Sequence, residues 1–138
     1  MNQLDLEGRV AVVTGGAQGI GYAIAERMLA SGAAVSLWDA DAAKLAEAKG
    51  TLGSAGRVFT EELDLTNEGA VAAATKRTIA AAGKIDIVVN NAGITGGNGT
   101  TWELAPDVWR RVIEVNLVAA DEVRRDQVDL DRPTSGAA

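Results

Sequence analysis

The sequence predicts an α/β fold in which helices cover both faces of a doubly wound parallel sheet. Short apolar runs alternate with helical patterns along the 138 residues. These runs lack a polar alternation, which is typical of strands that are buried on both faces. A glycine-rich turn joins the first run to the first helical pattern. We therefore expect parallel strands in the order 3-2-1-4, joined by right-handed crossovers.

The elements follow from the spacing of apolar residues and from their boundary residues. Strands are expected at 10–13, 34–38, 57–63 and 85–89, and helices at 18–30, at 41–52, from about 67 to 82, and from 106 to at least 120. Asp41 is a candidate N-cap of the second helix, and Thr66 or Asn67 of the third. Gly32 and Gly83 are expected to follow helix ends. A pair of acidic residues in the third strand, 61–62, suggests a sheet edge.

Composition excludes several classes of function. The chain is 47% hydrophobic, has a net charge of −6 and contains neither cysteine nor histidine. The apolar fraction supports one folded domain, and the acidic balance argues against a nucleic-acid partner. Thiol catalysis, disulfides and the usual zinc sites are excluded, so we predict no metal site. No segment resembles a membrane span or a signal peptide. We expect a cytoplasmic protein.

The segment 10–21, VAVVTGGAQGIG, carries the clearest functional signal. Gly15, Gly19 and Gly21 separate an apolar run from a helix start, so the backbone can approach a ligand and unpaired N–H groups can face a phosphate. Asp39 ends the next apolar run, where an acid can accept hydrogen bonds from an adenosine ribose. The alternatives are a tight connection without a ligand and a solvated acid at a strand end.

Four motifs occur in register along the chain: TGGAQGIG at 14–21, DL at 64–65, NNAG at 90–93, and Asn116 within VIEVNL. The chain resembles the N-terminal half of a classical short-chain dehydrogenase/reductase over residues 4–118. The resemblance implies an incomplete Rossmann-like sheet. It also implies that residues 1–118 form an NAD-binding half-domain. Residues 119–138 are rich in charge and poor in large apolar residues, so they are expected to be a divergent, disordered tail.

The resemblance assigns a role to each cofactor-binding residue. The pyrophosphate is expected to be bound by Gly15, Gln18, Gly19, Ile20 and Gly21. Asp39 is expected to bind the adenosine ribose, and a neutral Gln18 beside it favours NAD over NADP. Asp64 is expected to contact the adenine amino group, with Leu65 beside the ring, whereas a helix cap or a solvated corner is the alternative for Asp64. The ribose is expected to be lined by Asn91, Ala92 and Gly93, while Asn90 is a candidate brace of the sheet; a purely structural loop is the alternative.

Asn116 is the one catalytic residue that the resemblance assigns. It is expected to be buried, to distort its helix locally and to hold a water in a proton relay to the family's lysine. The alternative is a buried Asn that is satisfied by neighbouring backbone. Tyr22 lies directly after the glycine turn, so it is not placed to be the catalytic tyrosine. Three tryptophans, Trp38, Trp102 and Trp109, are expected in the core or at an interface.

The resemblance stops after Leu117, and the family's catalytic Ser, Tyr and Lys have no counterparts in the sequence. We therefore expect a truncated or frameshifted oxidoreductase of a secondary alcohol or ketone, such as a sugar derivative, that binds NAD without turnover. The alternatives are a non-catalytic dinucleotide-binding fragment and a dimerising interaction module. A homo-oligomer would form through the helix at 106–125 or through the exposed edge of the fourth strand.

Overall fold

The structure is a computed structural model that describes residues 4–94, 105–121 and 123–125. The chain alternates strands and helices, as the apolar pattern predicts. The elements in chain order are β1 (Val10–Thr14), α1 (Gly19–Ala30), β2 (Ala34–Asp39), α2 (Ala42–Leu52), β3 (Val58–Glu62), α3 (Glu68–Ala82), β4 (Ile87–Val89), α4 (Pro106–Ile113) and η2 (Glu114–Val118).

The four strands form one parallel sheet in the order β3-β2-β1-β4, so the predicted fold class is confirmed. β1 lies between two neighbours: Val12 pairs with Ser36 of β2 and with Val88 of β4. On the other side of β2, Asp39 pairs with Glu62 of β3. The carboxyl ends of β1, β2, β3 and β4 therefore lie along one edge of the sheet, where open α/β sheets bind ligands.

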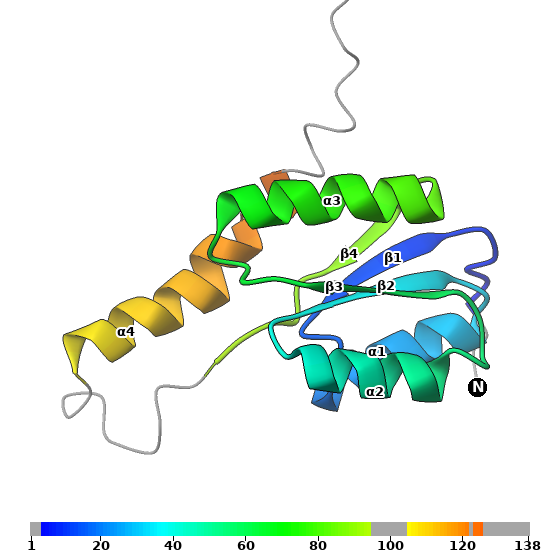
Figure 1. Ribbon diagram of the computed structural model, residues 1–138, viewed down its shortest axis with the longest axis horizontal. Helices are drawn as coiled ribbons and strands as arrows, with labels where there is room; N and C mark the ends of the chain where they lie inside the picture. Colours follow the sequence, from blue (N-terminus) through cyan, green and yellow to red (C-terminus); the bar gives the residue numbers. More distant parts are fainter. Residues whose placement is uncertain (1–3, 95–104, 122, 126–138) are drawn as a thin grey trace, which may run out of the picture.

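Helices pack on both faces of the sheet (Figure 1). Each face has its own apolar core. On one face α1 and α2 contact side chains such as Val13 and Leu37. On the other face α3 contacts a cluster that includes Val12 and Trp38. Alternate residues of β1 thus point into opposite cores, which explains why this strand is apolar without alternation. Trp38 is a core residue, as predicted.

Local boundary residues act largely as the sequence predicts. Asp41 caps α2 by accepting a hydrogen bond from the Lys44 amide. Of the two candidate caps of α3, Asn67 fills the role and accepts from the Ala70 amide. Gly83 ends α3 in a left-handed conformation (φ 93°), which glycine adopts without steric cost. β4 is shorter than the predicted run 85–89.

The last described helix reaches into the segment that was expected to be a disordered tail. Beyond η2 the chain is again helical at 119–121 and 123–125, and Val123 is buried against Trp38 and its neighbours. The expectation of a disordered tail from residue 119 is therefore wrong for these residues, because Ala119 and Val123 recover enough apolar contact to extend the helix. Residues 122 and 126–138 lie outside the described part of the chain.

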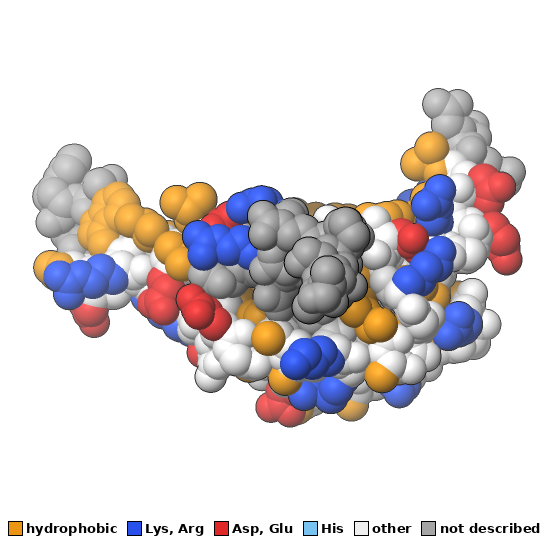
Figure 2. All heavy atoms as spheres, turned by 90° about the horizontal axis from the view of Figure 1, so that it is seen from above, with side chains coloured by type: hydrophobic (Ala, Val, Ile, Leu, Met, Phe, Trp, Pro, Cys, Tyr) orange, Lys and Arg blue, Asp and Glu red, His pale blue; other side chains and the backbone are white. Residues whose placement is uncertain are grey.

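One face of α4 and η2 stays exposed. Trp109, Ile113 and Leu117 recur at helical spacing and are 40%, 47% and 67% exposed. Figure 2 shows hydrophobic side chains gathered at this end of the molecule. Trp109 is thus not a core residue, and Trp102 lies outside the described residues. Among the helices that the structure describes, none has the length and apolar character needed to cross a membrane.

Asp86 joins the start of β1 to the segment before β4 and should make stability depend on pH. Its carboxylate accepts from the Val10 amide at 2.8 Å and lies 3.0 Å from the Lys84 Nζ. Burial works to raise the pKa of Asp86, but these partners, with Arg9, hold it below its ordinary value of 3.8. Because the folded pKa is lowered, this stabilisation is present above the unfolded pKa and is lost as pH falls through the folded value.

We therefore expect Asp86→Asn to lower the free energy of unfolding at pH 7. The difference in free energy of unfolding between the two proteins should become smaller as the pH falls below about 4. Denaturant titrations of both proteins between pH 7 and pH 3 measure this difference. A deficit that is equally large at pH 3 would contradict the assignment. Asp5→Asn, an exposed acid near the N-terminus, serves as the control.

Candidate functional site

The turn between β1 and α1 has the geometry of a phosphate cradle. Gly15 and Gly19 adopt positive φ angles of 63° and 59°, in the region that glycine accepts most readily. A Cβ atom at Gly21 would collide with the Gly15 carbonyl oxygen and lie 2.6 Å from the Asn91 Nδ2. The three predicted glycines are therefore needed for two different reasons: backbone conformation at Gly15 and Gly19, and close helix packing at Gly21.

The N-terminus of α1 is open to an anion. Gln18 is the N-cap, its backbone is extended, and no side chain caps the helix there. The first turn of α1 contains no acidic residue. Ile20 is 74% exposed beside this end of the helix. Amide groups at an uncapped helix start, together with the helix dipole, favour a negatively charged group at this point.

A polar network ties the end of β4 to the glycine turn. The Thr14 hydroxyl oxygen accepts hydrogen bonds from the Asn91 and Ala92 amides, both at 3.0 Å. The Asn91 side chain donates to the carbonyl oxygens of Thr14 and Gly15 at 3.2 and 3.3 Å. Asn90, the predicted brace of the sheet, is instead exposed. The bracing role belongs to Asn91, because its side chain is the one that faces β1.

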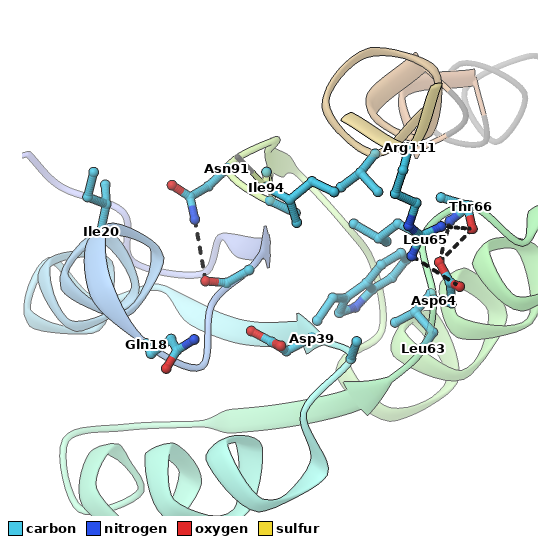
Figure 3. Close-up of a pocket in the computed structure, with 16 residues that line it drawn as sticks. Gln18, Ile20, Asp39, Leu63, Asp64, Leu65, Thr66, Asn91, Ile94 and Arg111 are labelled. Carbon is cyan, nitrogen blue, oxygen red and sulfur yellow. Dashed lines mark hydrogen bonds and ion pairs between the residues drawn. The ribbon is translucent and has the colours of Figure 1, made fainter. Parts of the chain in front are cut away.

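These segments surround a cleft of about 520 Å³ at the carboxyl edge of the sheet (Figure 3). This volume lies within the range of roughly 300–1,000 Å³ that is usual for small-molecule sites. All of the predicted cofactor-binding residues except Gly19 and Gly21 line it. Those lining residues are Gly15, Gln18, Ile20, Asp39, Asp64, Leu65, Asn91, Ala92 and Gly93. The sequence motifs, which are far apart along the chain, therefore meet at one site.

Asp39 lies between the glycine turn and the rest of the cleft. Its Oδ2 accepts from the Ala17 amide at 3.3 Å, and its Oδ1 accepts from the Asp41 amide at 3.1 Å. These bonds fix the carboxylate, which is half-buried, at the end of β2. An ionised carboxylate has about four acceptor sites, so each oxygen can still accept from a ligand hydroxyl. The residues present therefore fit a ribose diol beside the cradle.

Asp64, at the β3–α3 corner, is held by two residues that the sequence analysis did not assign to the site. Its Oδ1 accepts from the Thr66 amide at 2.9 Å and from the Thr66 hydroxyl at 2.7 Å. The Arg111 Nη2, from α4, lies 3.8 Å from Oδ2. The Thr66 hydrogen bonds, with a smaller contribution from Arg111, lower the pKa of Asp64. A D-x-T spacing could have indicated Thr66, whereas no local pattern points to Arg111.

Asn116 binds backbone rather than lining the cleft. Its Oδ1 accepts from the Ile94 amide at 2.7 Å, and its Nδ2 donates to the Ile94 carbonyl at 2.9 Å. The expectation that Asn116 is buried is wrong, because the residue is exposed. Asn116 does lie in the π-helical turn η2, a distortion that often marks functional sites. Its role in a proton relay remains a prediction.

Comparison with known proteins identifies the class of the chain. A family model described as short chain dehydrogenase matches residues 9–131. The chain is 44% identical over 110 residues to a 2-dehydro-3-deoxy-L-rhamnonate dehydrogenase (NAD(+)) of Sphingomonas sp., which covers 80% of this chain and 43% of the relative. The fold, the glycine turn and this match agree. The chain belongs to the short chain dehydrogenase family.

Solved structures extend the similarity to three dimensions. A short chain dehydrogenase from Mycobacterium smegmatis superposes with a TM-score of 0.85 at 33% identity, over 94% of this chain and 56% of that one. A 3-ketoacyl-(acyl-carrier-protein) reductase from Brucella melitensis, in complex with NADH, gives 0.86 at 32% identity, over 91% and 50%. The chain thus spans about half the length of the relatives that it matches.

Proposed function

We propose that this chain is the NAD-binding half of an oxidoreductase that acts on a secondary alcohol or ketone. The observation that carries this proposal is the cleft, where the glycine turn, Asp39 and the end of β4 meet in one volume of about 520 Å³. Family membership supports a dinucleotide as the ligand. When it is bound, the nicotinamide supplies or accepts a hydride.

Different residues of the cleft would bind different parts of the dinucleotide. Backbone amides at the start of α1 would hold the pyrophosphate, and Asp39 would accept hydrogen bonds from the adenosine ribose. Leu65 is half-buried and would lie beside the adenine ring. The 2′-phosphate of NADP would lie against the Asp39 carboxylate and be repelled by it. Gln18 is neutral, so it provides no positive charge to bind that phosphate. This electrostatic difference supports NAD over NADP as the cofactor.

We propose further that this 138-residue chain does not turn over substrate. Its single tyrosine, Tyr22, packs against the core cluster of α1 and α2 instead of facing the cleft. The family's reaction uses a tyrosine at Y-x-x-x-K spacing as general acid and base, and the sequence contains no such pair. A sugar derivative is the favoured substrate class for the whole protein, because the Sphingomonas relative is named for a deoxy sugar acid.

A second candidate function is self-association. The exposed apolar face of α4 and η2, formed by Trp109, Ile113 and Leu117, supports it. The edge of β4 offers a further surface, because Ile87–Val89 pair with β1 on one side and are only half-buried. Sedimentation of the chain with and without NAD distinguishes the candidates: an interaction module associates regardless of the dinucleotide.

The proposed function is tested by calorimetric titration of the 138-residue chain with NAD and with NADP. We expect saturable binding of NAD and binding of NADP that is at least tenfold weaker. If neither dinucleotide gives a heat of binding, the proposal is overturned. A spectrophotometric assay with a mixture of secondary alcohols and NAD then tests turnover, and sustained reduction of NAD would refute the statement that the chain is inactive.

A further inference from the structure

Arg111 and Thr66 form a small network with Asp64 across the far end of the cleft, and all three residues line it (Figure 3). Thr66 donates its hydroxyl proton to the Asp64 Oδ1 at 2.7 Å. The same Thr66 oxygen accepts from the Arg111 Nη1 at 3.3 Å. A hydroxyl has one proton, so its orientation is determined from both sides. The network connects α4 with the β3–α3 corner, which is 45 residues away in the chain.

The two oxygens of Asp64 have different surroundings. Oδ1 already accepts two hydrogen bonds from Thr66. Oδ2 lies 3.8 Å from the Arg111 Nη2, which is close enough for attraction but too far for a hydrogen bond. Attraction to Arg111 therefore helps to orient Oδ2, but Arg111 does not occupy the acceptor sites of this oxygen. Oδ2 can therefore still accept a hydrogen bond from an N–H donor of a ligand.

The charge balance of the cleft supports this assignment. Among the residues that the structure describes as lining it, Arg111 is the one cation, and it lies at the Asp64 end. Asp39, at the other end, has backbone amides as its partners. The two carboxylates therefore differ in what they can bind. Asp39 is suited to a pair of hydroxyls, and Asp64 to a single amino group.

We propose that Arg111 and Thr66 are positioning residues that aim the Asp64 Oδ2 at the amino group of the adenine ring, and that they thereby make the site selective for an adenine dinucleotide. This inference rests on the proposed function. Arg111 contributes through the carboxylate and not through the pyrophosphate. Its loss should weaken binding only of ligands that carry the amino group.

The test uses calorimetry to compare NAD with its purine analogue, in which hydrogen replaces the adenine amino group. We expect the unmodified chain to bind NAD about tenfold or more tightly than the analogue, since hydrogen bonds to charged groups are among the stronger ones. Arg111→Met and Thr66→Val should weaken NAD binding and bring this ratio close to one. Thr66→Ser, which keeps the hydroxyl, should retain the ratio. The matched control is Arg110→Met, which removes the neighbouring cation outside the cleft lining.

A second readout works without any dinucleotide. Carboxyl NMR titration should show a higher pKa for Asp64 in Arg111→Met and Thr66→Val than in the unmodified chain. The proposal is overturned if Arg111→Met weakens both ligands equally, if it affects neither, or if the Asp64 pKa does not move. If the unmodified chain binds neither ligand although the pKa moves as expected, the proposed function fails, and with it the selectivity assigned here. The network itself would then be purely structural.

Discussion

Replacement of Gly21 by alanine should lower the free energy of unfolding by about 1–3 kcal/mol and should abolish measurable NAD binding. A Cβ atom at this position would collide with the Gly15 carbonyl oxygen and lie 2.6 Å from the Asn91 Nδ2. Gly15 belongs to the cradle, and the Asn91 side chain donates to its carbonyl oxygen. Relief of the collision must therefore move α1 away from β1, and the amides that face the pyrophosphate move with it.

Denaturant unfolding and calorimetric titration of Gly21→Ala measure the two effects. The matched control is Gly50→Ala in α2, where an added Cβ meets nothing within 4 Å. Alanine is the better helix former by about 1 kcal/mol, so we expect this control to be more stable than the unmodified chain and to bind NAD equally well. A Gly21→Ala variant with unchanged stability and affinity would show that the close approach of α1 has no importance.

Substitution of Asp39 by asparagine should weaken NAD binding by about tenfold or more and remove most of the discrimination against NADP. Hydrogen bonds to a charged group contribute roughly 1.5–3 kcal/mol, and about 1.4 kcal/mol corresponds to a factor of ten. Asparagine also removes the charge that would repel a 2′-phosphate. The ratio of NAD to NADP affinity should therefore move towards one.

Competitive titration with both dinucleotides checks this expectation. Glu62→Gln is the control, because Glu62 pairs with Asp39 in the sheet register, is exposed and does not line the cleft. We expect it to leave the affinity ratio unchanged. If Asp39→Asn retained the preference of the unmodified chain, Asp39 would not be the residue that selects the ribose, and the orientation proposed for the dinucleotide would have to be abandoned.

The fold could be predicted from the sequence because its signals are local. An apolar run such as Val10–Val13 is typical of a strand that is buried on both faces, as in a parallel sheet with helices above and below it. Asp41 and Gly83 mark helix ends because capping depends on neighbouring backbone groups. β4 was predicted too long, since the ends of a strand depend on distant packing partners.

Those residues of the candidate site that belong to sequence motifs could be predicted. Gly15, Asp39 and Asn91 line the cleft as expected, because each lies at the carboxyl end of a strand and these ends share one edge of the sheet. Thr66, which was expected only as a candidate helix cap, and Arg111 were missed as site residues. Their roles arise from contacts between the β3–α3 corner and α4, which are 45 residues apart, and a charged residue on a helix has no distinguishing pattern.

The order of apolar runs, glycines and caps was sufficient to specify the layered sheet and the cradle, because turns, caps and alternation depend on residues within one helical turn or one strand. Burial of Val123, exposure of Asn116 and the pairing of Arg111 with Asp64 required the packed molecule. These features depend on which surfaces meet across the sheet. Contacts of that kind arise from long-range apolar packing and charge, which no short stretch of sequence encodes.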